Sequence, residues 1–266
     1  MRIKNNLIKA SVLAVSLALS QFVLADGIKV GVITGKEYEV AETAVKVAKE
    51  KFNLDVELVE FNDYVIPNEA LDSGDIDLNA FQHKPFLDEQ IEARGYKLTP
   101  VANTFVYPIA AYSKNIKSID ELAEGSTITL PNDPTNLGRA LLLLEKQGLI
   151  KLEEGVGLNP SVLDVVENPK KLNLVELEAP LLPNSLDDKT VALSVINTTY
   201  ASSIGLTPTK DGIFVEDKES PYVNIIVARE NNKDSEEVKQ FIQAYQSEEV
   251  FEKANSLFDG GAVKGW

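Results

Sequence analysis

The segment of residues 28–61, IKVGVITGKEYEVAETAVKVAKEKFNLDVELVEF, indicates the fold class of this chain. Its first six residues form a short, mostly apolar segment, and residues 55–61 alternate apolar and polar side chains; both patterns are typical of strands. Between them, residues 37–52 place apolar side chains at helical spacing. The sequence of strands and helices continues with a helix at residues 67–73, a strand at residues 76–81 and a helix at residues 85–94. This order predicts a mostly parallel sheet covered by helices.

The rest of the chain predicts a second lobe of the same kind. Residues 104–113 are expected to form a strand that runs into a crossing between lobes, and residues 222–229 a strand that crosses back. The elements between the crossings are predicted at residues 119–124, 127–130, 135–149 and 191–196, with a helix from about Thr199. Residues 235–258 carry helical spacing and are expected to close on the first lobe.

We therefore predict an α/β protein of two lobes, each a mostly parallel sheet flanked by helices, joined by two interlobe crossings. Residues 26–109 and 225–266 are assigned to lobe 1, and residues 110–224 to lobe 2. Sheets of this kind bind ligands outside the carboxyl ends of their strands, which places a binding cleft between the lobes.

Residues 1–25 have the features of a cleaved signal peptide. Basic residues come first, an apolar run follows at residues 10–19, and residues 23–25 match a small-residue cleavage site. We expect cleavage at Ala25|Asp26 and export of the remaining chain. The sequence contains no cysteine, so no residue is present that accepts a lipid after the signal, and we expect no lipid anchor.

The composition argues against several classes of function. A formal net charge of −15 disfavours binding to nucleic acid or to an anionic membrane. With no cysteine and with His83 as the one histidine, disulfides are excluded and a zinc site is disfavoured. The one methionine is Met1, so the chain after signal cleavage would contain no sulfur. This suits a protein that is made when sulfur amino acids are scarce.

The stretch of residues 131–144, PNDPTNLGRALLLL, predicts a helix start that attracts an anion. Asp133 is a plausible N-cap, and Pro134 is tolerated in the first helical turn. Free N–H groups, the positive end of the helix dipole and the guanidinium of Arg139 would converge there, which suits a carboxylate or a phosphate. Phosphate-binding glycine motifs are missing from the sequence. The alternative is an ordinary capped helix with a solvated arginine.

Polar and aromatic residues follow two other predicted strands. His83 comes after the strand at residues 76–81 and, with Phe81 and Tyr64, could form a semi-polar aromatic wall; Phe81 as a plain core residue is the alternative. A catalytic triad through His83 lacks a nucleophile motif. Asn197 follows the strand at residues 191–196, and Asn224 lies near the second crossing.

Amide oxygens such as those of Asn197 and Asn224 can accept hydrogen bonds from an ammonium group, although a cap or turn role is equally open to each residue. Together with Arg139 and Asn136, they provide partners for both charges of a zwitterion. The sequence thus indicates a site for a small amino acid-like ligand.

These segments carry a specific resemblance along nearly the whole chain after the signal. The chain resembles the methionine-binding proteins of bacterial ABC importers, the MetQ/NlpA family. The stretches that carry the resemblance are residues 61–64 with 67–71, 74–77 with 78–85, 103–108, 131–144, 185–188, 192–201, 219–227 and 260–266.

The resemblance implies a type II periplasmic binding protein that captures methionine, with the D-form as an open possibility beside the L-form. The partner it implies is a permease and its ATPase. Arg139 and Asn136 would hold the ligand carboxylate, and Asn197 and Asn224 the amine. The residues implied to enclose the thioether are Tyr64, Phe81, His83 and Tyr107.

The resemblance further implies a monomeric, non-enzymatic protein without cofactor or metal. Most members of the family are lipoproteins with a cysteine directly after the signal, whereas Ala25 and Asp26 stand there in this chain. We therefore expect a free periplasmic protein. Three alternatives stay open: a binder of another small amino acid or dipeptide, a secreted hydrolase, and a surface antigen or adhesin with an incidental cleft.

Overall fold

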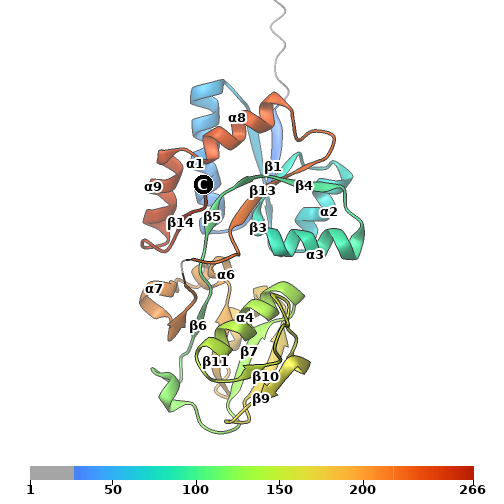
Figure 1. Cartoon of the computed structure of the whole chain (residues 1–266). Coiled ribbons are helices and arrows are strands. Elements are labelled where there is room, and N and C mark those ends of the chain that lie inside the picture. Colours follow the sequence, from blue (N-terminus) through green and yellow to red (C-terminus); the bar gives the residue numbers. More distant parts are fainter. Residues whose placement is uncertain (1–26, 218) are drawn as a thin grey trace, which may run out of the picture.

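The computed structural model describes residues 27–217 and 219–266, so the predicted signal peptide and its cleavage site lie outside the described residues. Two five-stranded sheets, each with its own helices, make up most of the described chain (Figure 1). Among the described residues, no helix is long and apolar enough to cross a membrane.

The first sheet has the strand order β2-β1-β3-β13-β4. Its strands are β1 (Ile28–Ile33), β2 (Val56–Phe61), β3 (Leu78–His83), β4 (Leu98–Asn103) and β13 (Asn224–Arg229). The helices of this lobe are α1 (Lys36–Phe52), α2 (Ile66–Ser73), α3 (Lys84–Arg94), α8 (Glu236–Tyr245) and α9 (Glu248–Leu257). β1 pairs in parallel with β2 and β3, whereas β13 runs antiparallel to both β3 and β4.

The second sheet has the order β10-β7-β11-β6-β12. Its strands are β6 (Ala110–Tyr112), β7 (Thr127–Pro131), β10 (Asn173–Leu177), β11 (Val191–Ile196) and β12 (Phe214–Val215). Its helices are α4 (Pro134–Lys146), α5 (Leu182–Ser185), α6 (Thr198–Ser203) and α7 (Pro208–Asp211), with short 3₁₀ turns at Ile119–Glu121, Val162–Asp164 and Ala179–Leu181. The two-stranded ribbons are β5 (Phe105–Val106) with β14 (Val263–Lys264), and β8 (Lys151–Leu152) with β9 (Val165–Glu167).

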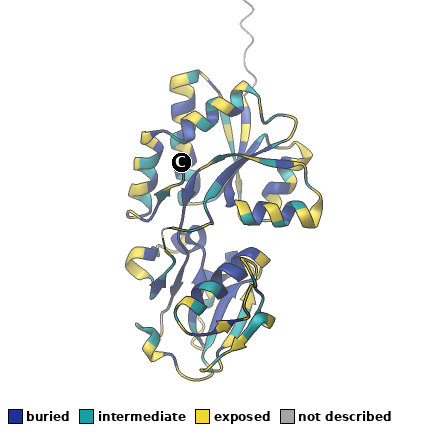
Figure 2. Ribbon diagram, viewed as in Figure 1, coloured by how far each residue is buried: buried dark blue, intermediate teal, exposed yellow. Residues whose placement is uncertain are grey.

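Each lobe has its own apolar core, which Figure 2 shows as buried strands and inward helix faces. In the first lobe, Val40, Ala44 and Val47 share one face of α1 and pack with the buried residues of α8 and α9. In the second, the leucine run of α4 packs on β7 and β11. Burial of these apolar faces, at roughly 25 cal/mol per Å², is the main term that holds each lobe together.

Two chain segments connect the sheets. The first leads from β4 through β5 to β6, and the second leads from β12 to β13 (Figure 1). β4 and β13 are neighbours in the first sheet, and β6 and β12 are neighbours in the second. Because each connecting segment enters at a strand, residues at the ends of these strands lie beside the space between the lobes.

The structure differs from the sequence prediction in several local details. Each sheet is mostly parallel, as predicted, but contains one reversed strand that the sequence did not indicate: β13 in the first sheet and β6 in the second. The strand expected at residues 104–113 is divided into β5 and β6, with Pro108 in the break. β4 was not predicted, and the helical material at residues 235–258 forms two helices, with Ser247 as the N-cap of the second.

Candidate ligand-binding site

One cavity brings together residues from both lobes. Its lining residues are Tyr64, Phe81, Gln82, His83, Phe86, Tyr107, Asn136, Arg139, Asn197, Thr198, Thr199 and Asn224. All eight residues that the sequence singled out are among them. Their placement around one space is a finding of the structure, whereas the contacts that each makes with a ligand stay a prediction.

The start of α4 is organised around Asp133. This residue is the N-cap, and its carboxylate accepts from the backbone N–H of Asn136 at 2.9 Å and from the Thr135 hydroxyl at 3.1 Å. The Asn136 side-chain amide also donates to Asp133, with Nδ2 at 2.9 and 3.0 Å from the two carboxylate oxygens. Burial raises the pKa of Asp133, and these hydrogen bonds act in the opposite direction.

Asn136 is held by partners from both lobes. Its Nδ2 is engaged by Asp133, and its Oδ1 accepts from Asn197 Nδ2 at 2.8 Å and lies 3.2 Å from His83 Nε2. Both polar atoms of the side chain thus have partners within the protein, and its contact with a ligand carboxylate stays a prediction. Its contacts are those of a residue that orients its neighbours.

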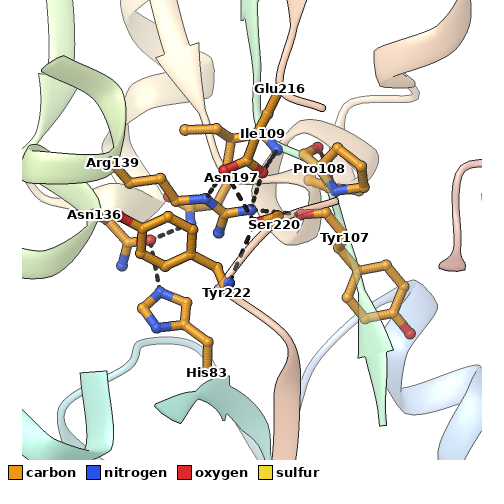
Figure 3. A network of polar contacts seen from close by, with 11 residues as sticks. His83, Tyr107, Pro108, Ile109, Asn136, Arg139, Asn197, Glu216, Ser220 and Tyr222 are labelled. Carbon is orange, nitrogen blue, oxygen red and sulfur yellow. Dashed lines mark hydrogen bonds and ion pairs between the residues drawn. The ribbon is translucent and has the colours of Figure 1, made fainter. Parts of the chain in front are cut away.

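Arg139 is buried, with 4% of its side chain exposed, and is held from three sides. Its Nε donates to Glu216 Oε1 at 2.9 Å, and its Nη2 donates to Glu216 Oε2 and, at 3.1 Å, to the carbonyl oxygen of Tyr107. The guanidinium carbon lies 4.5 Å from the centre of the Tyr222 ring (Figure 3). Nη1 has no hydrogen-bond partner among the described residues, and it is the donor left for a ligand.

His83 is a neutral hydrogen-bonding residue here. Burial, with the Arg139 charge as the second cause, lowers the pKa of His83 to about 3. Its Nδ1 accepts from the backbone N–H of Phe86 at 3.2 Å, so Nε2 carries the proton and donates to Asn136 Oδ1. Because its pKa is about 3, the ring stays neutral near neutral pH.

The two other amides have different surroundings. Asn197 precedes α6, but its side chain makes no capping bond, and its Oδ1 is buried without a partner among the described residues. Because an unpaired buried acceptor is costly, this oxygen marks a place where a ligand donor fits. Asn224 donates from Nδ2 to the carbonyl oxygen of Phe81 at 3.1 Å, which joins β13 to the aromatic side of the cavity.

The apolar side of the cavity is a cluster of rings from lobe 1 and α6. Tyr64 lies 5.8 Å from Phe81, 6.1 Å from Phe86 and 4.9 Å from Tyr200, measured between ring centroids. Tyr107 lies apart from this cluster, with its ring 4.6 Å from that of Phe258. The cluster offers a polarisable surface to an extended apolar side chain.

Several residues of the site were missed from the sequence. Phe86, Gln82, Thr198 and Thr199 line the cavity, and Glu216 lies behind it. Glu216 is one of many acids in the chain, and only its contact with Arg139, far away in sequence, distinguishes it. Phe86 could have been found, because it follows His83 by three residues at the start of a helix.

A second buried acid joins the lobes. Glu37, in the first turn of α1, is 4% exposed and accepts a hydrogen bond from the Thr199 hydroxyl of α6. Burial raises the pKa of Glu37 to about 7. Among the described residues, no group of three or more acidic or histidine side chains is placed to hold a metal ion.

The two-lobed fold, with a cavity between lobes that offers an arginine donor, an amide acceptor and an aromatic wall, defines a substrate-binding protein of the type II periplasmic class. Residues 28–266 match the model of the family described as NlpA lipoprotein. The chain belongs to this family.

Relatives of known description agree with this assignment. The D-methionine-binding lipoprotein MetQ of Yersinia pestis is 74% identical over 239 residues, which cover 90% of this chain and 88% of that protein. A crystal structure described as the methionine-binding protein MetQ is 74% identical, has a TM-score of 0.90 and is matched over 90% of this chain and 98% of its own. A nutrient-binding protein from Burkholderia cenocepacia bound to methionine is 50% identical, with a TM-score of 0.87 over 90% and 100% of the two chains.

These names correct one expectation from the sequence. We expected a free periplasmic protein without a lipid anchor, but the family and the Yersinia relative are both described as lipoproteins. The expectation was wrong because it rested on the missing cysteine alone. That absence does not outweigh 74% identity to a protein named as a lipoprotein.

Proposed function

We propose that this protein captures methionine in the cavity between its lobes and delivers it to an ABC importer. The observation that carries the proposal is the presence, in one cavity, of the Arg139 Nη1 donor and the Asn197 Oδ1 acceptor, neither of which has a hydrogen-bond partner among residues 27–217 and 219–266. One suits a carboxylate and the other an ammonium, as a zwitterionic amino acid requires. The resemblance to methionine-binding proteins narrows the choice of amino acid.

The thioether side chain would lie against the ring cluster of Tyr64, Phe81 and Phe86. Sulfur–aromatic contacts are worth about 0.3–1.5 kcal/mol, so this wall favours methionine modestly over an aliphatic side chain of the same length. His83 would form the edge of the wall, since its neutral ring lies 6.2 Å from that of Phe86. Asn224 and Tyr107 would complete the enclosure near the connecting segments.

We propose a role in binding and delivery, without catalysis, cofactor or metal. The permease and ATPase as partners, and a monomeric state, are part of the same proposal, and they rest on the family resemblance. We also propose that lobe 1 consists of residues 26–109 and 225–266, and lobe 2 of residues 110–224. The membership of β13 in the first sheet and of β6 in the second supports these boundaries.

A direct test is the identification of the retained ligand. The purified protein would be unfolded and refolded to remove bound ligand, incubated with an equimolar mixture of amino acids and methionine dipeptides, and analysed by native mass spectrometry. We expect one equivalent of methionine, and calorimetry with each enantiomer would then rank the L- and D-forms. Retention of another amino acid would refute the methionine assignment, and turnover of a dipeptide would favour a hydrolase.

A further inference from the structure

A series of hydrogen bonds connects Asp133 to the cavity, and in each bond the donor and the acceptor are fixed by the bond before it. Asp133 accepts four hydrogen bonds, from the backbone N–H of Asn136, the Thr135 hydroxyl and, at both carboxylate oxygens, Asn136 Nδ2. An ionised carboxylate can only accept, so the amide of Asn136 must turn its Nδ2 toward Asp133. Its Oδ1 then faces the opposite way, toward Asn197.

The next bond transmits this orientation. Asn136 Oδ1 can only accept, and it accepts a hydrogen bond from Nδ2 of Asn197 at 2.8 Å. The Asn197 amide is thereby turned so that its Oδ1 is the atom without a partner in the described part of the chain. Asn197 lines the cavity, with 7% of the residue exposed. The orientation of Asn197 thus depends on an acid that does not itself line the cavity.

A second restraint acts on the same atom. The backbone N–H of Phe86 donates to His83 Nδ1 at 3.2 Å, which places the remaining ring proton on Nε2. Nε2 lies 3.2 Å from Asn136 Oδ1 and donates to it. The start of α3 in lobe 1 and the start of α4 in lobe 2 therefore impose the same orientation on Asn136. Figure 3 shows the resulting contacts of Asn136 with His83 and Asn197.

From this series of bonds we infer that Asp133 is a positioning residue which, through Asn136, fixes Asn197 Oδ1 as an acceptor and so makes the cavity select ligands with a protonated amine. The inference rests on the proposed function, since it explains how the cavity would recognise the amine of an amino acid. An amide that could turn freely would present Nδ2 for part of the time, and that group does not bind an ammonium.

The test compares two ligands across matched variants. The amine penalty is defined as the ratio of the Kd of 4-(methylsulfanyl)butanoate, which is methionine without its amine, to the Kd of methionine. For the wild-type protein we expect a penalty of at least about 100-fold, because the amine-free ligand leaves a buried acceptor unpaired. Asp133→Asn retains a capping oxygen but adds a donor, which removes the Asp133 restraint on the Asn136 amide and leaves the His83 restraint in place.

We expect the penalty to fall at least about tenfold in Asn136→Ala, which breaks the series of bonds without removing the cap. It should fall by a smaller factor in Asp133→Asn, where His83 still restrains Asn136. Because both changes act on the same series of bonds, the double variant should show no fall beyond that of Asn136→Ala. Ser247→Ala is the matched control, because Ser247 caps α9 through a bond to the Val250 N–H outside the cavity. It should lower the melting temperature and leave the penalty unchanged.

The outcomes separate this inference from the function on which it rests. A full wild-type penalty that persists in both Asp133→Asn and Asn136→Ala would overturn the positioning role and leave the proposed function intact. A wild-type protein that binds no methionine would overturn both. If Asp133→Asn does not fold, Asn136→Ala decides the question, since its capping bond donor is the backbone N–H and is retained.

Discussion

Arg139 and Glu216 form a buried ion pair that ties the start of α4 to the segment between β12 and β13. Glu216 takes the Nε and Nη2 edge of the guanidinium and has 14% of its side chain exposed. It is held in turn by the Ile109 N–H and the Ser220 hydroxyl, each at 3.3 Å. The Nε and Nη2 donors, which often bind a carboxylate together, are therefore occupied by Glu216. The charges of Arg139 and Glu216 also neutralise each other without a ligand.

This balance predicts how Glu216→Gln changes ligand choice. Without the acid, Arg139 carries a buried charge that the ligand must neutralise, so anionic ligands gain relative to zwitterions. We expect the ratio of the Kd of N-acetylmethionine to the Kd of methionine to fall about tenfold, which corresponds to about 1.4 kcal/mol. Calorimetry with the two ligands measures this ratio.

The neighbouring acid supplies the control for that variant. Asp217 pairs with Lys146 at the surface, where both side chains are at least half exposed, so Asp217→Asn should leave the ratio unchanged. An equal fall in both variants would show that the effect is one of overall charge rather than of the Arg139 pair.

Arg139→Ala should abolish most methionine binding and also weaken the fold. Loss of the ligand contact is expected to cost about 2–5 kcal/mol of binding, and leaving Glu216 buried without a partner costs about 3–5 kcal/mol of stability. Arg139→Met combined with Glu216→Gln removes both charges. The melting temperature of this double variant should then recover, while calorimetry still detects no tight methionine binding. If both the melting temperature and methionine binding recover, Arg139 does not bind the ligand carboxylate.

Both charges of the ligand should be needed. Methionine amide lacks the carboxylate that Arg139 Nη1 would bind, and N-acetylmethionine lacks the ammonium that Asn197 Oδ1 would accept. Each should bind at least about tenfold more weakly than methionine in competition calorimetry, because each leaves a buried group unpaired. If N-acetylmethionine binds as well as methionine, the amide oxygens of Asn197 and Asn224 have another role.

Glu37 predicts a pH-dependent stability. Its folded-state pKa is raised to about 7 from an ordinary value of 4.5, so the folded protein holds this proton more tightly than the unfolded chain. The stabilisation is complete below about 4.5 and is lost as the pH rises through about 7. The difference in unfolding free energy between wild type and Glu37→Gln should therefore shift by about 3 kcal/mol against the wild type from pH 4.5 to 8.

Denaturant titrations at several pH values measure this shift, and Glu39→Gln is the control. Glu39 lies in the same first turn of α1, but its side chain is 45% exposed and pairs with Lys253. Its removal should leave the pH profile of the wild type unchanged. If the difference in unfolding free energy between wild type and Glu37→Gln does not change with pH, the pKa of Glu37 is not raised in the folded protein.

The parts of the fold that depend on short-range sequence were predictable. Asp133 and Pro134 marked the start of α4 because capping and proline preferences act within one turn. The βαβ order at residues 28–61 was clear from periodicity alone. The insertion of β13 between β3 and β4 was not, because antiparallel pairing of segments more than a hundred residues apart leaves no local signal.

The residues of the candidate site were also predictable only where a local sequence pattern marks them. Arg139, Asn197 and the aromatic residues follow strand ends or open a helix, and the sequence pattern at these positions is enough to indicate a cleft. Glu216 and Glu37 gain their roles from burial against Arg139 and Thr199, across 77 and 162 positions of the chain. Acids are usually exposed, so no sequence pattern distinguishes these two from the rest of the 41 acidic residues.

The choice of side chain should be governed mainly by shape and only in part by sulfur. Norleucine replaces the sulfur by a methylene, and because a sulfur–aromatic contact is worth about 0.3–1.5 kcal/mol, it should bind only several-fold more weakly than methionine. Leucine should bind less well because it is branched and shorter, and glutamine least well because its amide would be buried without partners. Phe81→Ala, which removes the ring stacked on Tyr64, should reduce these differences while the need for a carboxylate persists. Competition calorimetry with the three analogues measures the order, and glutamine that competes as well as methionine would disprove methionine selectivity even though the fold is unchanged.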